Sequence, residues 1–161
     1  ASLKSLPILF ICENNNYSVY SDLKARQPKK RKISSLTRSI GIKSYYSNGK
    51  NVYKIIDKLS LAKDHVIKTG KPCFVEIDTY RWFEHCGVNN DDNLNYRPKK
   101  ILDNWKKNDN LYLLEKKLIQ KKVNIKEIKN NIYKKVLKAF KYAEKSKFPK
   151  YEDLMKGVYA K

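Results

Sequence analysis

The sequence of 161 residues lacks any apolar run close to the roughly 20 residues with which a helix crosses a bilayer. Its most apolar stretch near the start, residues 6–12, has no small-residue cleavage site and leads directly into the polar residues 13–16. This stretch therefore predicts a strand rather than a signal peptide, and we expect no membrane association.

Cysteine is also scarce, since Cys12, Cys73 and Cys86 are an odd number without CxxC spacing. This usage argues against a disulfide framework and favours reduced thiols in a cytoplasmic protein. Glycine and proline are limited to five residues each, and there are no internal repeats or low-complexity linkers. The chain therefore suits a single domain, in which we expect Cys12 and Cys73 to lie buried on strands.

Positive charge is abundant, because 36 Lys and Arg against 16 Asp and Glu give a net charge of +20. Basic chains attract phosphates, nucleic acids and anionic membranes. Nearly all of this charge is lysine, however, and the accompanying asparagine and tyrosine are what AT-rich coding would produce. No RNA-recognition, zinc-finger or helix-turn-helix signature occurs, so we expect no nucleic-acid partner and interpret the basic run at residues 28–32 as an exposed loop.

The first half of the chain alternates strand and helix patterns. A continuous apolar run at residues 7–12 predicts a strand buried on both faces of a parallel sheet. Further strands are expected at 41–46 and 73–79, with helices around 34–40 and 52–67. These two β-α-β units predict a layered, parallel α/β sheet with right-handed connections. Its first strand would leave an apolar edge open, so we expect an element preceding Ala1, or another chain, to cover it.

The second half has a different pattern. Residues 80–97 form a polar loop rich in Asn and Asp, and only helices are expected beyond it. Apolar residues at helical spacing and a capping box at Asn124 and Glu127 support these helices. The expected helices span residues 111–118, 125–143 and 151–156.

Two strands end in polar residues at the edge where parallel sheets bind ligands. Residues 13–17 follow the first strand, and residues 80–85 follow the third. Asparagine and main-chain carbonyl oxygens suit Mg²⁺, and Arg81 and His85 could hold a diphosphate. The residues by themselves also fit a plain polar turn and a solvated loop.

Several segments, in order along the chain, carry a resemblance to a known family. They are Leu6–Tyr17 with its Glu-Asn-Asn-x-Tyr, Gly70-Lys71-Pro72, Phe74-Val75-Glu76, Thr79-Tyr80-Arg81, Tyr96-Arg97, Trp105–Asp109, Ala143–Ser146 and Val158–Ala160. Together they are similar to the E1 α subunits of thiamine-diphosphate-dependent 2-oxo-acid dehydrogenases, the pyruvate, branched-chain and acetoin enzymes. No single motif is decisive, but the set covers essentially the whole chain at family spacing.

The resemblance implies the C-terminal half of a thiamine-diphosphate-binding fold. Residues 1–79 would form its β/α core, 80–97 the active-site loop and 98–161 a helical C-terminal region. The implied enzyme is an oxidoreductase that decarboxylates a 2-oxo acid and transfers the acyl group to lipoamide, using thiamine diphosphate and Mg²⁺. The implied partners are the E1 β subunit in a heterotetramer, the missing N-terminal α segment and a lipoyl-bearing E2 component.

The same resemblance implies roles for individual residues. By position, Asn15 would give its side-chain oxygen and Tyr17 its main-chain carbonyl to Mg²⁺. His85 matches the active-site loop histidine that contacts the diphosphate and positions the substrate or acyl group. Arg81 matches the arginine that anchors this loop, and we also expect it at the cofactor. The other histidine, His65, is expected to be structural.

The sequence departs from the family pattern at several positions. Glu84-His85-Cys86 stands where the family has Gly-His-Ser, which changes the charge of the loop and removes the hydroxyl that mitochondrial relatives phosphorylate. Asn48-Gly49 replaces Asp-Gly, and Asn110 replaces a usual Pro. The family's Gly-Asp-Gly, whose Asp is the third metal ligand, is absent, and the Glu that activates the cofactor belongs to the β chain. We therefore expect this polypeptide alone to be inactive.

Two other functions stay open at this point. The lysine content fits a basic module that binds nucleic acid or another polyanion. The altered loop around His85 fits a thiamine-diphosphate carboligase of a biosynthetic pathway.

Overall fold

A computed structural model describes residues 1–29 and 31–159 of the chain. Lys30 of the basic run and Ala160 of the C-terminal motif lie outside the described residues. The chain forms two compact units, Ala1–Leu113 and Leu114–Lys161. The division into a core, an active-site loop and a helical region stays a prediction.

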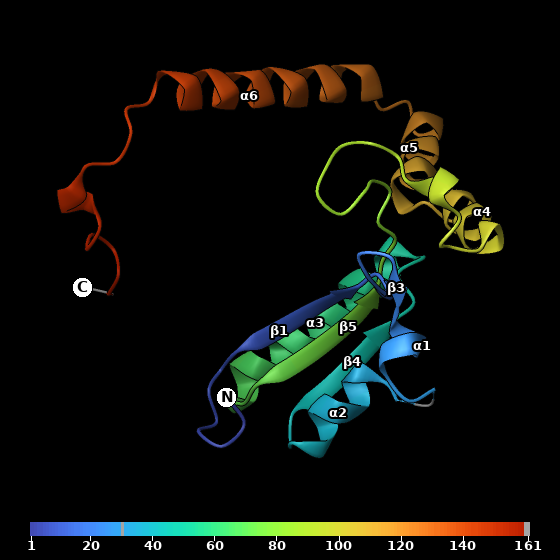
Figure 1. The fold of residues 1–161 in the computed structure, drawn as a ribbon, viewed down its shortest axis with the longest axis vertical. Coiled ribbons are helices and arrows are strands. Elements are labelled where there is room, and N and C mark those ends of the chain that lie inside the picture. The colour runs from blue at the N-terminus through green and yellow to red at the C-terminus, as the bar shows by residue number, and fades with distance from the viewer. Residues whose placement is uncertain (30, 160–161) are drawn as a thin grey trace. The chain divides into compact units, whose positions relative to one another are not determined.

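A three-stranded parallel sheet forms the centre of the first unit (Figure 1). Its strands are β1 (Leu9–Asn14), β4 (Lys43–Ser47) and β5 (Cys73–Asp78), in the order β1-β5-β4. On the central strand, Val75 lies opposite Ile11 on one side and opposite Tyr45 on the other. Parallel neighbours need crossover connections, and helices form part of the connections here. The predicted α/β class, a parallel sheet with flanking helices, is therefore confirmed.

Helix α3 (Val52–Thr69) covers one face of this sheet and builds the core (Figure 1). The side chain of Asn51 begins the helix by accepting hydrogen bonds from two main-chain amides of the first turn. Gly70 ends it in the left-handed conformation, at φ 65°. The buried hydrophobic cluster consists of Ala62 from the helix and Cys73, Val75 and Ile77 from β5. Burial of Cys73 on a strand agrees with the prediction.

Helix α2 (Ile33–Ser39) lies on the opposite face, where it makes polar contacts with the sheet. The Glu76 side chain of β5 is buried there and accepts a hydrogen bond from the Ser34 amide at 2.9 Å. The hydroxyl groups of Thr37 and Ser44 lie 2.6 Å apart and join the helix to β4. Hydrogen bonds therefore help to join α2 to this face of the sheet, which also carries Phe10 and Phe74.

Strand β1 differs from its prediction in both bounds and burial. It extends through Glu13 and Asn14, which pair with β5 in spite of their polar side chains. It is an edge strand, and no described residue pairs with its other edge. Phe10 is 38% exposed and Ile11 is 52% exposed, so the expected burial on both faces is wrong for the described chain. Cys12 is half-buried rather than buried for the same reason.

Residues 17–26 form short strands and a helical turn, although the sequence predicts no strand or helix there. They contain a hairpin of β2 (Tyr17–Ser18) and β3 (Ser21–Asp22), followed by the single-turn helix α1 (Leu23–Arg26). Asp22 caps this turn, because its carboxylate accepts a hydrogen bond from the Lys24 amide at 2.8 Å. These short elements were missed because two-residue strands leave no alternating pattern in the sequence.

The second half of the chain is helical, as expected. Its elements are the 3₁₀ turn η1 (Asp92–Leu94), α4 (Lys99–Lys107), α5 (Asn110–Gln120), α6 (Ile125–Lys145) and the 3₁₀ turn η2 (Tyr151–Asp153). Asn124 caps α6 by accepting from the Glu127 amide at 3.1 Å, which confirms half of the predicted capping box. The helix expected at 151–156 is only a 3₁₀ turn. None of the described helices is both long and apolar enough to cross a membrane.

Two glycines with positive φ provide a matched test of how closely the chain approaches the end of β5 at Gly49. An added methyl group at Gly49 (φ 71°) would lie 1.7 Å from the Asp78 carbonyl oxygen, whereas one at Gly70 (φ 65°) would meet nothing within 4 Å. Gly70→Ala should cost only the left-handed strain of about 1 kcal/mol. Gly49→Ala should cost about 3 kcal/mol or more, because the backbone must also move. Urea denaturation of both variants measures this, and equal costs would contradict the close approach.

Candidate functional site

The turn after β1 is built by its own asparagine side chains. The Asn14 side-chain oxygen accepts a hydrogen bond from the Asn16 amide at 2.9 Å, and that of Asn15 accepts one from the Tyr17 amide at 2.8 Å. Asn16 adopts a left-handed conformation at φ 65°, which asparagine tolerates better than most residues. Two consecutive side-chain turns therefore fix the direction of the chain as it leaves the sheet.

The ends of β1 and β5 are tied together at this point. The Thr79 amide donates to the Asn14 carbonyl oxygen at 2.9 Å, and the Leu23 amide donates to the Asn16 carbonyl oxygen at 2.7 Å. The first bond extends the sheet by one residue, and the second ties α1 to the turn. The segments after both strands therefore begin at one edge of the sheet, as the sequence predicts.

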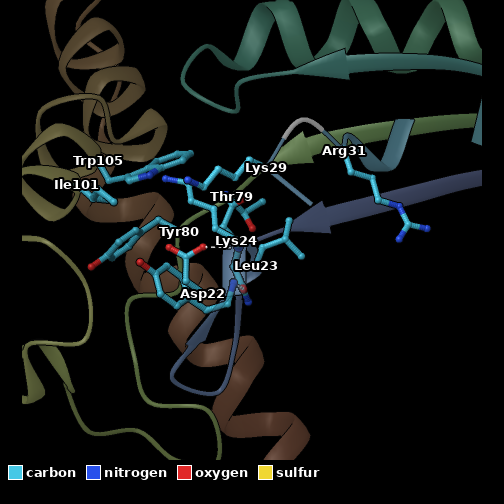
Figure 2. A pocket seen from close by; sticks show the side chains of 12 residues that line it. Asp22, Leu23, Lys24, Lys29, Arg31, Thr79, Tyr80, Ile101 and Trp105 are labelled. Atoms are coloured by element: carbon cyan, nitrogen blue, oxygen red, sulfur yellow. Dashed lines mark hydrogen bonds between the residues drawn. The ribbon is translucent and has the colours of Figure 1, made fainter. Parts of the chain in front are cut away.

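A cavity of about 320 Å³ opens beyond these strand ends. It is lined by Asn15, Asn16, Tyr17, Asp22, Leu23, Lys24, Lys29, Arg31, Thr79, Tyr80, Ile101 and Trp105. Figure 2 shows Ile101 and Trp105 of α4 on one side, with Leu23 and Thr79 facing them, while Arg31 points away from the group. Asn15 and Tyr17, the predicted metal ligands, thus lie in one hollow with the start of the predicted loop.

The lining of this cavity combines neutral oxygens with positive charge. Lys24 and Lys29 contribute ammonium groups, whereas the one carboxylate of the lining, Asp22, already accepts from the Lys24 amide. An amide oxygen has two lone pairs, so that of Asn15 can bind a cation while it accepts from Tyr17. No group of three His, Cys, Asp or Glu side chains fit for a metal occurs among the described residues. A hard cation here would therefore depend on neutral oxygens and on groups from elsewhere.

Arg81 anchors the loop instead of lining the cavity. Its Nε atom donates to the Phe83 carbonyl oxygen at 2.9 Å. One Nη atom donates to the Val19 carbonyl oxygen at 3.2 Å, to the Tyr96 hydroxyl at 2.7 Å and to an Asp91 carboxylate oxygen at 3.1 Å. These contacts tie the start of the loop to its end and to the β2–β3 hairpin. They suit an anchoring residue, whereas direct binding of a cofactor by Arg81 stays a prediction.

A second arginine completes this network. Arg97 forms ion pairs with Asp91 and, at 3.0 Å, with Asp92, and it also donates to the Arg81 carbonyl oxygen at 2.6 Å. The Asp91 side chain is only 2% exposed and lies between the two guanidinium groups. A buried carboxylate held by two arginines is a strong local constraint on the loop.

Aromatic rings enclose the Arg97 guanidinium. Its central carbon lies 4.7 Å from the centre of the Tyr80 ring and 4.8 Å from that of Tyr96. The Tyr96 ring packs edge-on against Tyr17 at 5.5 Å and Tyr20 at 4.9 Å, which joins the loop to the hairpin. Burial raises the pKa of Tyr80 to about 12, although the guanidinium charge opposes the shift. Tyr80 therefore presents a neutral hydroxyl at pH 7.

His85 lies at the tip of the loop and is exposed, outside the lining of the cavity. The Glu84 amide donates to the Asn89 carbonyl oxygen at 2.8 Å, and the Asn89 side-chain amide donates to the Glu84 carboxylate, also at 2.8 Å. These two bonds close the tip, residues 85–88, into a tight turn. The loop starts at the cavity, but the role of His85 there stays a prediction.

Sequence reasoning missed the part that Asp91 and Arg97 play in the loop. The aspartate stands in a run of Asn and Asp, and Arg97 was noted only as part of a motif. The signal that could have indicated this role is the rarity of arginine. Two of the five arginines, Arg81 and Arg97, lie in the loop, and the other three, Arg26, Arg31 and Arg38, precede it. An arginine among many lysines is favoured where planar, bidentate recognition of a carboxylate is needed.

The pH dependence of stability should report on Asp91. Burial raises the pKa of its carboxyl, but the Tyr96 hydroxyl and the charges of Arg97 and Arg81 outweigh this and leave the pKa below its usual value. A lowered folded-state pKa stabilises the fold above about pH 4 and ceases to do so as the pH falls through that lowered pKa.

Asp91→Asn should therefore cost about 3 kcal/mol at pH 7, because it leaves two guanidinium groups without their counter-charge. The difference from the wild type should shrink as the pH falls below about 4. Denaturation at a series of pH values measures this difference. The same substitution at Asp103, which is exposed on α4, should have little effect, and a cost at Asp91 that does not change with pH would contradict the ion-pair account.

Comparison with known proteins supports one family across this fold and site. The model of the family described as "Dehydrogenase E1 component" matches residues 1–152. A pyruvate dehydrogenase E1 component subunit alpha from Rickettsia bellii is 28% identical over 163 residues, which cover 99% of this chain and 49% of the relative. The testis-specific mitochondrial form of that subunit from Rattus norvegicus is 27% identical, covering 99% of this chain and 41% of the relative.

A second type of subunit also matches the whole chain. The mitochondrial 2-oxoisovalerate dehydrogenase subunit alpha from Mus musculus is 28% identical, covering 99% of this chain and 36% of the relative. The chain thus spans about half the length, or less, of the curated relatives it matches, which fits a C-terminal half. Because the family model extends over nearly all of the sequence, the resemblance is confirmed and the chain belongs to the dehydrogenase E1 component family.

Proposed function

We propose that this chain is the C-terminal half of the α subunit of a thiamine-diphosphate-dependent 2-oxo-acid dehydrogenase, and that it holds the Mg²⁺-diphosphate end of the cofactor. The observation that carries the proposal is the shared cavity of Asn15 and Tyr17 at the carboxyl end of the parallel sheet. This is the edge at which open α/β sheets bind their ligands. The activity, substrates and partners of the whole enzyme are part of the proposal, because the chain spans only part of its relatives.

The donor set of the cavity fits magnesium. Mg²⁺ prefers hard oxygen ligands and completes its octahedron with phosphate oxygens and water. Asn15 would supply its side-chain oxygen and Tyr17 its main-chain carbonyl oxygen. The third protein ligand and the glutamate that activates the cofactor would come from the other half of the α subunit and from the β subunit.

The basic side chains of the cavity favour an anionic ligand. Lys24 and Lys29 bring positive charge to the hollow in which the metal would sit, whereas the Tyr80 hydroxyl already donates to the Asp92 carboxylate at 3.1 Å. A diphosphate that keeps negative charge after binding one Mg²⁺ would be attracted by both lysines. When bound, thiamine diphosphate supplies the carbanion chemistry of 2-oxo-acid decarboxylation, and the residues of this chain orient and neutralise it.

The loop contributes a closing element to the proposed site. Arg81 and Arg97 fix its base through Asp91, so the tip is tethered at both ends. We propose that His85 reaches the diphosphate and the acyl group when the β subunit and a lipoyl-bearing E2 component complete the assembly.

A second candidate function rests on Glu84. Its carboxylate, held by Asn89 directly before His85, adds negative charge where the family pattern has glycine. This change favours a different acyl acceptor, and the candidate reaction is carboligation, in which a carbon–carbon bond to an aldehyde or a second 2-oxo acid would form in place of acyl transfer to lipoamide. Assaying acyl transfer to lipoamide against carbon–carbon bond formation, in the complete assembly, separates the two functions.

Removing the proposed metal ligand tests the site directly. In an assembly of the complete α and β subunits, Asn15→Ala should weaken Mg²⁺-dependent binding of thiamine diphosphate about 100-fold, because an oxygen ligand is lost. Titration calorimetry with Mn²⁺ and thiamine diphosphate gives the affinity. Asn130→Ala, at an exposed position of α6, is the matched control. Unchanged affinity in Asn15→Ala would rule out the assignment.

The two histidines provide a matched test of the loop. His85→Ala should lower turnover of the 2-oxo acid about 100-fold, since the group that positions the reacting acyl fragment is lost. His65→Ala, on α3, should leave turnover nearly unchanged. Steady-state kinetics with a panel of 2-oxo acids measures both variants. Equal effects of the two substitutions would remove His85 from the site.

A further inference from the structure

We propose that Glu76 is a positioning residue for the metal-binding turn and acts on Asn15 and Tyr17 through the side chain of Asn14. The proposal rests on the proposed function, because it explains how those two residues are held for the metal. Glu76 itself lies on β5 and does not line the cavity.

The first step concerns the burial of Glu76. The residue is only 5% exposed, and in the described part of the chain it forms no ion pair. Its two carboxylate oxygens accept from two different N–H donors, the Asn14 side-chain amide at 3.0 Å and the Ser34 main-chain amide at 2.9 Å. An ionised carboxylate satisfies both donors because it is an acceptor only.

The second step concerns the orientation of Asn14. Its amide nitrogen faces the carboxylate of Glu76, and its oxygen therefore faces the Asn16 amide, from which it accepts at 2.9 Å. A flipped side chain would bring its NH₂ group against the Asn16 N–H and its oxygen against the carboxylate. The acceptor oxygen of Glu76 thus fixes which way the Asn14 amide points, and this direction holds Asn16 in its left-handed conformation.

The third step reaches the proposed ligands. The hydrogen bonds between Glu76 and Asn14 and between Asn14 and Asn16, here called the relay, fix the residues on both sides of Asn15. The side-chain oxygen of Asn15 itself accepts from the Tyr17 amide. If Asn16 leaves the left-handed region, the direction of the chain changes, and the Asn15 oxygen and the Tyr17 carbonyl no longer point to a common centre. Groups that orient metal ligands typically change metal affinity by about 10–100-fold when they are removed.

A purely structural role for Glu76 would act through Ser34. The hydrogen bond to the Ser34 amide holds the start of α2 against the sheet, so loss of the carboxylate would also loosen that helix. Among the described residues the buried Ser34 hydroxyl has no hydrogen-bond partner, whereas the Ser34 amide carries the contact to Glu76. Ser34→Ala therefore keeps both bonds to Glu76 and serves as a matched control at the same place.

The test reverses the hydrogen-bond donor and acceptor between Asn14 and Glu76 instead of removing the contact. Glu76→Gln replaces one acceptor oxygen with an NH₂ group. The Ser34 main-chain N–H can only donate, so it keeps the glutamine oxygen, and the NH₂ group meets Asn14, whose amide nitrogen loses its acceptor. Adding Asn14→Asp restores the pattern, because the new glutamine donates to the new aspartate and the second aspartate oxygen accepts from the Asn16 amide. Asn14→Asp alone brings two carboxylates together and should also be damaging.

The variants are measured in the assembly of complete α and β subunits. With thiamine diphosphate present, Mn²⁺ affinity should fall at least tenfold in Glu76→Gln and in Asn14→Asp, and it should return to within about threefold of the wild type in the double variant. Ser34→Ala should match the wild type. Unchanged affinity in Glu76→Gln, or failure of the double variant to recover, would overturn the proposal.

Hydrogen exchange separates this proposal from the proposed function. Amide exchange in residues 13–18, followed by mass spectrometry without metal or cofactor, should be faster in Glu76→Gln and return to normal in the double variant. If the wild-type assembly does not bind Mn²⁺ and thiamine diphosphate, the proposed function fails, while this exchange pattern still supports the relay. Exchange that is the same in all variants would overturn the relay itself.

Discussion

The two unlike faces of strand β5 organise the first unit. Its odd-numbered residues, Cys73, Val75 and Ile77, pack against α3 and make the apolar core, whereas Glu76 on the other face holds α2 and the end of β1 by hydrogen bonds. One strand therefore supplies both the burial that stabilises the sheet and the polar contacts that shape its carboxyl edge. The candidate site lies where these contacts end, which couples the stability of the core to the geometry of the turn after β1.

The loop that follows β5 depends on charge rather than on apolar packing. Asp91, placed between Arg81 and Arg97, brings together the start and end of an 80–97 segment that contains little regular structure. Asn110 plays a related part further along, because its side chain donates to the Gly49 carbonyl oxygen at 2.6 Å, at a position where the family usually has proline. In both places side-chain hydrogen bonds and ion pairs hold the chain in position, as main-chain hydrogen bonds do in the helices and strands of the unit.

The sequence predicts the sheet well because strands and helices with a regular spacing of apolar residues can be recognised from neighbouring positions along the chain. The helix at α3 and the strand at β5 follow from it, and so does the meeting of the two strand ends that brings Asn15 and Tyr17 into the cavity with Thr79. The hairpin at residues 17–22 could not be predicted, because two-residue strands leave no alternating pattern. The Arg97–Asp91 pair could not be predicted either, because nothing in a run of Asn and Asp marks the carboxylate that an arginine will bind. Burial of β1 was wrong for a different reason: whether an apolar strand is covered is decided by its spatial neighbour, which the described chain does not provide.

The uncovered edge of β1 has a consequence for how such a chain can exist in a cell. A row of backbone N–H and C=O groups beside Phe10 and Ile11 is a template for any strand that reaches it, including the same strand of another copy. An exposed edge of this kind therefore favours association between copies, and a strand or loop that pairs with it would prevent that association.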